Sequence, residues 1–144
     1  DLTIRPRVRD LGGPRGLPLF KPPYSQLVAF DMNEGEKLWH VPVGEGPRDH
    51  ADLQGLELPP LGNFEKLGGP LLTKSLLFIG QGFEVNRLGV YDKDTGEELW
   101  WMQLPNRFHA APITYMADGK QYIVFALGGG ARGEPEQLLA LSLP

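Results

Sequence analysis

The sequence of 144 residues contains no cysteine. Disulfide bonds, thiolate metal sites and cysteine nucleophiles are therefore excluded. It also lacks an apolar run of about 18 residues, so we expect no membrane-spanning segment. The formal net charge is −4, and no basic field covers the whole chain. We therefore expect no nucleic-acid partner.

No stretch of the sequence has the apolar spacing of an amphipathic helix of useful length. Glycine and proline are abundant instead, with 19 and 14 residues. Such a frequency of turn-forming residues is typical of short strands joined by tight turns. Because 41% of the residues are hydrophobic, we expect the chain to fold. Together these features predict an all-β fold.

Two segments of the sequence are copies of one unit. Residues 26–43 read QLVAFDMNEGEKLWHVPV, and residues 87–104 read RLGVYDKDTGEELWWMQL. They align without a gap at an offset of about 61 residues, which marks a repeated supersecondary unit. In each copy, alternating apolar residues lead into an Asp-x-x-x-Gly turn, so each copy is predicted to be a β-hairpin. The identical pairs are Leu27/Leu88, Asp31/Asp92, Gly35/Gly96, Glu36/Glu97, Leu38/Leu99 and Trp39/Trp100.

A weaker repeat surrounds the second hairpin. Strand-like runs precede it at residues 69–73 and 76–80 and follow it at residues 111–115 and 121–126, and residues 137–143 resemble the first strand of the hairpin again. If the strands of one repeat are called A to D, their order along the chain is C-D, A-B-C-D, A-B-C. Four antiparallel strands in each repeat are typical of a β-propeller. The sequence therefore predicts an all-β, incomplete β-propeller of about two blades plus part of a third.

The strand order also predicts how the chain is divided. We expect an extended lead-in (1–24), a C-D hairpin (25–43), a long loop (44–66), a complete blade (67–104) and a last blade without its fourth strand (110–144). A propeller needs about four to eight blades. We therefore expect the chain to be the C-terminal part of a larger propeller or one chain of a split propeller. We expect the long loop to cover one face of the propeller, where long loops often serve function.

The repeated hairpin resembles the tryptophan-docking repeat of the pyrroloquinoline-quinone (PQQ) dehydrogenases. The resemblance rests on residues 28–39 (VAFDMNEGEKLW) and on their copy at 90–100 (VYDKDTGEELW). Residues 18–24 (PLFKPPY), 67–73 (LGGPLLT) and 112–124 (PITYMADGKQYIV) are similar to the end of the glucose-dehydrogenase-like branch of that family. The resemblance covers almost the whole chain.

The resemblance implies an eight-bladed propeller that binds PQQ together with a calcium ion. It implies oxidation of a sugar or an alcohol, with electrons passing to a quinone or cytochrome acceptor outside the cytoplasm. A periplasmic location follows, and an attachment to the membrane through a preceding N-terminal region stays open. We expect the catalytic base and most calcium ligands to lie outside this segment, so the chain alone is expected to be inactive, with no catalytic residue and no metal ligand of its own.

The resemblance places the glycine-rich loop after the B strand of the last blade at the quinone pocket. Gly129, Gly130 and Ala131 would bring the backbone close to a flat ligand, and Arg132 could meet a carboxylate of the quinone or an acidic substrate. Gly130 stands where glucose-oxidising relatives often have histidine, which leaves sugar specificity open. The alternative is a flexible connection between two strands.

Leu67 and Gly68 are the second predicted contact with the cofactor. In methanol-dehydrogenase-like relatives a tryptophan at the Leu67 position touches the quinone, and leucine matches the glucose-type branch. A tight entry into the strand explains the same residues without a ligand.

Other conspicuous residues have structural interpretations. We interpret Trp39 and Trp100 as packing between adjacent sheets, and we expect Trp101 on the opposite face to be partly exposed. Asp92-x-Asp94-x-Gly96 is interpreted as a turn, because the ligand spacing of a calcium loop is missing.

The histidines and arginines give only weak signals of a site. His40, His50 and His109 lack metal-ligand spacing, and His109 is the best placed of the three for an active site. The arginines near the N-terminus are expected to be solvated; they are Arg5, Arg7, Arg9 and Arg15. A second function class also stays open, namely a non-catalytic propeller scaffold built from the same repeat.

Overall fold

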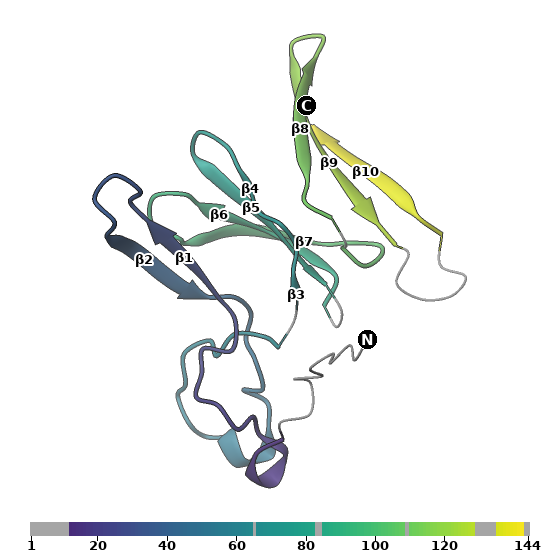
Figure 1. Cartoon of the computed structure of the whole chain (residues 1–144). Helices are drawn as coiled ribbons and strands as arrows, with labels where there is room; N and C mark the ends of the chain where they lie inside the picture. The colour runs from purple at the N-terminus through teal and green to yellow at the C-terminus, as the bar shows by residue number, and fades with distance from the viewer. Residues whose placement is uncertain (1–11, 65, 83–84, 109, 129–134, 143–144) are drawn as a thin grey trace, which may run out of the picture. The chain divides into compact units, whose positions relative to one another are not determined.

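The structure, a computed structural model, describes residues 12–64, 66–82, 85–108, 110–128 and 135–142. Within these ranges the only helical segments are two short 3₁₀ turns, η2 (Pro14–Gly16) and η3 (Ala51–Leu53), and the rest of the regular structure is strand (Figure 1). The chain forms two compact units. One comprises Asp1–Leu27 and Pro42–Phe64, and the other comprises Val28–Val41 and Glu65–Pro144.

The second unit contains a sheet that corresponds to the complete repeat. Its strands are β3 (Lys66–Leu67), β4 (Leu71–Leu72), β5 (Leu76–Gly82), β6 (Arg87–Asp92) and β7 (Glu98–Gln103). They run in the order β3-β5-β6-β7, and β4 also pairs with β5. All the pairings are antiparallel.

The first strand of this sheet differs from the prediction. Residues 69–73 were expected to form one A strand, but the sheet edge consists of the two-residue strands β3 and β4. The interruption falls at Gly68, Gly69 and Pro70. Proline has no N–H to donate to a ladder, and glycine weakens a strand, so pairing with β5 stops there and resumes after it.

The repeated hairpin owes its turn to one aspartate and one glycine. In the second copy the Asp92 carboxylate accepts hydrogen bonds from the backbone N–H of Asp94 (2.9 Å) and of Thr95 (2.8 Å). Gly96 N–H then donates to the Asp92 carbonyl, with Gly96 at a φ of 77°. Glycine adopts this left-handed conformation without steric cost. The turn chemistry predicted for the repeat is therefore confirmed.

The first copy closes in the same way. It joins β1 (Gln26–Phe30) and β2 (Lys37–Pro42), which form a two-stranded sheet. Asp31 accepts a hydrogen bond from Asn33 N–H at 2.8 Å, and Gly35 has a φ of 72°. The two hairpins are thus repeats in structure as well as in sequence.

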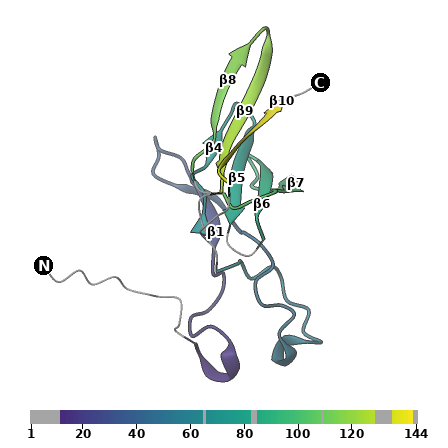
Figure 2. The same ribbon diagram turned by 90° about the vertical axis from the view of Figure 1, so that its right-hand side faces the viewer.

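The last sheet has the strand order β10-β9-β8 (Figure 2). It comprises β8 (Ile113–Ala117), β9 (Lys120–Leu127) and β10 (Gln137–Ser142). Asp118 and Gly119, both at positive φ, join β8 to β9. Consecutive positive φ values are what a two-residue Asp-Gly hairpin turn requires.

A phenylalanine between the complete sheet and the last sheet occupies space left by two glycines. A Cβ atom added to Gly68 or to Gly80 would collide with the ring of Phe108. Phe108 also meets Phe125 edge to face, with ring centroids 5.8 Å apart. The buried core around these rings comprises Leu88, Leu104, Phe108, Phe125 and Leu127. Burying one such side chain contributes roughly 1.5–3 kcal/mol.

A tryptophan connects the first hairpin to the complete sheet. Trp39 Nε1 donates a hydrogen bond to the carbonyl of Lys93 at 3.0 Å. The Trp39 ring lies on Gly96, where an added Cβ would come within 2.6 Å of the ring. Gly96 therefore serves both its own turn and the ring of the neighbouring sheet, and the packing interpretation of Trp39 is confirmed.

Trp100, the repeat equivalent of Trp39, is 52% exposed, so the prediction that it is buried between sheets is wrong for this chain. Trp39 has the carbonyl of Lys93 and the open Cβ position of Gly96 to dock on, and no such contact of Trp100 is found among the described residues. Trp101, on the opposite face, is also exposed, as predicted.

The first unit is held by backbone hydrogen bonds between distant segments. Val43 N–H donates to Ser25 (3.0 Å), Asn63 N–H donates to Val43 (2.8 Å), and Tyr24 N–H donates to Leu61 (2.8 Å). Val43 and Leu61 are buried. Residues 44–66 were predicted as a loop without a strand pattern. The ladder joins three segments and has no period-2 apolar alternation, so the local sequence did not reveal it.

We predict that Gly80→Ala lowers the free energy of unfolding by about 1–3 kcal/mol, the usual cost of overpacking a core. The added methyl group meets the Phe108 ring. Urea unfolding at equilibrium measures the change. Gly12→Ala is the control, because no heavy atom lies within 4 Å of its added Cβ. An equal effect of both substitutions would contradict the prediction.

We further predict that Trp39→Phe costs about 1–2 kcal/mol, because the indole hydrogen bond to Lys93 and part of the ring contact are lost. The matched control is Trp100→Phe, which changes the exposed copy of the same residue by no more than about 0.5 kcal/mol. Both values come from urea unfolding curves. Equal losses in the two variants would show that the docked indole contributes nothing specific.

Candidate functional site

The predicted cofactor residues fall into two groups. Gly129, Gly130, Ala131 and Arg132 lie outside the described residues. Leu67 ends β3, where it pairs with Gln81 of β5. The backbone N–H of Gly68 donates to the carbonyl of Gly80 at 2.7 Å. The assignment of these residues to cofactor binding stays a prediction.

The backbone of Gly68 is already contacted by other groups of the chain. Its N–H is already used by Gly80, and the direction of its missing Cβ is filled by the ring of Phe108. The close approach that only glycine allows is therefore made by a side chain of the same unit.

A polar cluster that the sequence reasoning missed lies across β5, β6 and β7. Gln81 is only 1% exposed, and its Nε2 donates to the hydroxyl of Tyr91 at 3.1 Å. Tyr91 is hydrogen-bonded to Glu98, which also forms an ion pair with Arg87. Gly89 makes room for these groups, since a Cβ there would lie 3.0 Å from the Tyr91 hydroxyl.

Burial of the phenol, followed by the charge of Glu98, raises the pKa of Tyr91 above its usual value. Tyr91 therefore remains a neutral hydrogen-bonding group and does not act as a base. Two further atoms of the cluster, Gln81 Oε1 and Arg87 Nε, are buried without a hydrogen-bond partner among the described residues. A glutamine within the apolar run of β5 was the signal that could have identified the cluster from the sequence.

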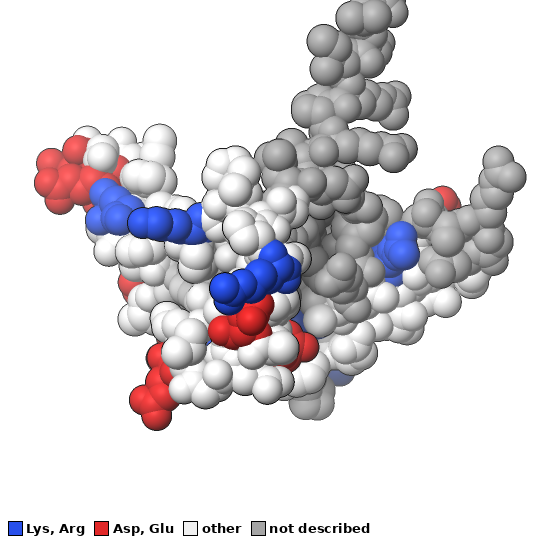
Figure 3. Space-filling view, turned by 90° about the horizontal axis from the view of Figure 1, so that it is seen from below, with Lys and Arg blue, Asp and Glu red and all other residues white. Residues whose placement is uncertain are grey.

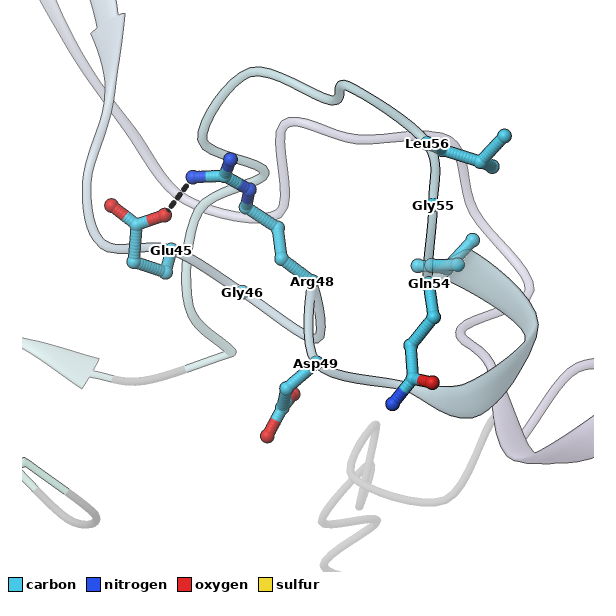
Figure 4. Close-up of a pocket in the computed structure, with 8 residues that line it drawn as sticks. Glu45, Gly46, Arg48, Asp49, Gln54, Gly55 and Leu56 are labelled. Atoms are coloured by element: carbon cyan, nitrogen blue, oxygen red, sulfur yellow. Dashed lines mark hydrogen bonds and ion pairs between the residues drawn. The ribbon is translucent and has the colours of Figure 1, made fainter.

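A shallow hollow of about 460 Å³ lies in the first unit. Figure 4 shows that Arg48 points to Glu45, with which it forms an ion pair. Asp49, next to Arg48 in the chain, and Gln54 are exposed, and their side chains point away from this ion pair. The lining residues are Glu45, Gly46, Arg48, Asp49, Leu53, Gln54, Gly55 and Leu56. The hollow thus offers carboxylate, amide and guanidinium groups within the loop predicted to cover a propeller face.

The histidines have different environments. His109, the best candidate from the sequence, lies outside the described residues, and His40 is exposed. His50 Nδ1 accepts a hydrogen bond from the N–H of Asp52 at 3.2 Å, and its Nε2 lies 3.1 Å from the carbonyl of Arg15. His50 therefore caps η3 and connects it to the lead-in segment.

Acidic and basic side chains lie next to one another on the face shown in Figure 3. Of the arginines near the N-terminus, Arg5, Arg7 and Arg9 lie outside the described residues. Arg15 forms an exposed ion pair with Asp52 at 3.6 Å. Exposed pairs of this kind contribute little to stability.

Asp92 is the residue for which a metal role and a turn role were compared. Its Oδ1 accepts three hydrogen bonds, from Asp94 N–H and from the N–H and hydroxyl of Thr95. No three acidic or histidine side chains come together as a metal site in the described ranges. The geometry therefore assigns Asp92 to the turn.

The described ranges contain no helix long and apolar enough to cross a bilayer.

The hydrogen bonds from Thr95 lower the pKa of Asp92 below its usual value, with the backbone N–H as the largest cause. Ionised Asp92 therefore stabilises the fold above the unfolded-state pKa, and this contribution is lost as the pH falls through the folded-state pKa.

We predict that Asp92→Asn flattens the acid side of the stability profile, measured as the urea midpoint from about pH 7 to about pH 2. Asp118→Asn is the control, because the Asp118 carboxylate is exposed and no hydrogen bond or ion pair to it is found in the described part of the chain. An unchanged acid profile in Asp92→Asn would show that the turn does not depend on this charge.

Comparison with known proteins identifies the family. Residues 3–123 match the family described as "PQQ: Glucose/ethanol/alcohol dehydrogenase, beta-propeller domain". The chain is 34% identical over 127 residues to a quinate/shikimate dehydrogenase (quinone) of Acinetobacter baylyi. This aligned region covers 84% of this chain and 15% of that protein. It is 34% identical over 136 residues to the quinoprotein glucose dehydrogenase of Escherichia coli. Here the aligned region covers 91% of this chain and 17% of that protein.

A solved structure of a quinohemoprotein alcohol dehydrogenase also matches part of this chain. The quinohemoprotein alcohol dehydrogenase of Pseudomonas putida HK5 matches with 32% identity and a TM-score of 0.48, over 73% of this chain and 12% of that chain. The chain spans 15% and 17% of the lengths of the two dehydrogenases above. The family match confirms the prediction of an all-β, incomplete β-propeller. This chain belongs to the family of PQQ-dependent glucose, ethanol and alcohol dehydrogenases, as part of their β-propeller domain.

Proposed function

We propose that this chain is a sector of the propeller of a PQQ-dependent dehydrogenase that oxidises a sugar or an alcohol. The observation that carries the proposal is the family match over residues 3–123. The names of the relatives include quinate/shikimate, glucose and 1-butanol dehydrogenases, and two of these names give a quinone or cytochrome c. An external quinone or cytochrome is accordingly the electron acceptor we propose here.

The structural part of the proposal concerns the contacts between sheets. Trp39 connects the first hairpin to the complete sheet, and Phe108 connects the complete sheet to the last one. In a whole enzyme these contacts would hold the wall of the cofactor pocket in place, while the cofactor supplies the redox chemistry. The remainder of the propeller, in the same or a separate polypeptide, is then the necessary partner.

The site proposal follows the sequence resemblance. Gly129, Gly130, Ala131 and Arg132 would face PQQ from the last sheet, and Leu67 and Gly68 would approach it from β3. A calcium ion would accompany PQQ, with its ligands mainly on the remainder of the propeller. The enzyme would work in the periplasm, where an external acceptor is accessible.

The proposal predicts that this chain can replace its counterpart in a known enzyme. In the glucose dehydrogenase of E. coli, the segment matching this chain is exchanged for it, and PQQ binding and glucose-dependent dye reduction are measured with PQQ and calcium present. We expect the hybrid to bind PQQ and to retain activity within about tenfold of the parent, a change of about 1.4 kcal/mol in the barrier. The isolated chain is expected to give no dye reduction.

The control exchange uses the corresponding segment of quinoprotein glucose dehydrogenase A of Acinetobacter calcoaceticus, a relative 31% identical to this chain. It shows whether the exchange itself is tolerated. If the control hybrid is active, and the hybrid carrying this chain folds but binds no PQQ, the chain is a non-catalytic propeller segment and the proposal is wrong.

A further inference from the structure

The C-terminal end of β5 has a single residue with a carbon side chain. Gln81 lies between Gly80 and Gly82, and the strand register places it opposite Leu67 of β3. Glycine loses more conformational freedom on folding than any other residue, and it weakens a strand. This end of β5 therefore depends on Gln81 for any contact that a side chain of its own can make.

The position of β3 depends on this end of β5. β3 consists of two residues, which is shorter than an ordinary strand, and it pairs with Gln81 and Gly82. The Gly68 N–H then donates to the Gly80 carbonyl at 2.7 Å. In the described part of the chain, β5 is the only strand that pairs with β3. The backbone of Leu67 and Gly68 is thus placed by the end of β5.

The side chain of Gln81 is anchored on the side of β5 away from β3. Its Nε2 donates to the hydroxyl of Tyr91 at 3.1 Å. Tyr91 is hydrogen-bonded to Glu98, and Glu98 forms an ion pair with Arg87. The guanidinium of Arg87 lies over the ring of Trp101, 4.7 Å from its centroid. These contacts connect the end of β5 to β6 and β7.

The internal repeat shows that an apolar residue can occupy the position of Gln81. Arg87 and Gln137 are the first residues of β6 and β10, the third strands of their repeats, and their cross-strand partners are Gln81 and Leu127. Gln81 is 1% exposed and Leu127 is 2% exposed. Gln81 leaves its Oε1 without a hydrogen-bond partner among the described residues, a cost that leucine does not have. Stability alone therefore does not explain the glutamine.

We propose that Gln81 is a positioning residue for the cofactor contact predicted at Leu67 and Gly68. Gln81 holds the end of β5 on Tyr91, and β3 takes its position from that end. Buried polar groups can fix one arrangement of strands at a cost in stability. The inference rests on the proposed function for the identity of the ligand, whereas the positioning of β3 is a property of the chain itself.

The first experiment measures β3 in the full chain without cofactor. Gln81→Leu introduces the side chain found at the equivalent position of the last sheet. We expect an unchanged or higher urea midpoint, because the unpartnered amide oxygen is removed and Tyr91 keeps Glu98. Amide hydrogen exchange at Gly68 should become about tenfold faster, since β3 loses its anchor, while the amides of β9 keep their rates. If Gln81→Leu does not fold, Gln81→Met takes its place.

The second experiment measures the dissociation constant of PQQ, with calcium present, in the hybrid glucose dehydrogenase described above. We expect Gln81→Leu to raise it about tenfold, equivalent to about 1.4 kcal/mol. Tyr91→Phe should weaken PQQ binding to a similar extent but lower the urea midpoint of the chain, because Gln81 Nε2 then lacks its partner. Equal losses of affinity with opposite changes in stability identify a positioning role.

The matched control is Gln121→Leu, the same substitution at an exposed residue of β9. It should change neither PQQ binding nor the exchange at Gly68. The proposal is wrong if Gly68 exchanges in Gln81→Leu as in the wild type, or if the affinity for PQQ simply follows the urea midpoint. A parent hybrid that binds no PQQ would contradict the proposed function instead, and the exchange at Gly68 would still decide whether Gln81 positions β3.

Discussion

The contacts between neighbouring sheets depend on aromatic rings that fill space left by missing Cβ atoms. The ring of Trp39 lies on Gly96, and the ring of Phe108 lies on Gly68 and Gly80. Protein interiors are close-packed, so a methyl group at any of these glycines would displace a whole ring. Each sheet is thereby held at a set distance from the next, and every face that lacks a neighbour exposes apolar side chains.

This constraint changes how the glycines are interpreted. A glycine at a strand entry can let the backbone approach a flat cofactor, or it can let a side chain of the protein approach. Gly68 lets a side chain approach, since Phe108 fills its Cβ direction, and its approach to a cofactor stays a prediction. The same packing makes Gln81, Tyr91 and Glu98 a buried polar cluster within a sheet that the sequence described only as apolar strands.

The parts of the fold that could be predicted from the sequence are those that local chemistry determines. The hairpins follow from period-2 alternation and from the Asp-x-x-x-Gly turns, in which Asp92 and Gly96 act within five residues. The ladder of Ser25, Val43 and Asn63 was missed, because it joins segments distant in the sequence. The cofactor loop was identified only by resemblance to a family, and such a resemblance transfers residue types without their contacts.

By itself, the sequence determined an all-β chain of repeated hairpins, because apolar alternation and turn residues act over a few neighbours. Only the tertiary structure decided that Trp39 is docked while its copy Trp100 is exposed, and that Leu88 is covered while Leu138 is not. Identical residues at equivalent repeat positions differ in this way because burial depends on which sheet lies opposite, and a neighbouring sheet is not encoded in the strand that it covers.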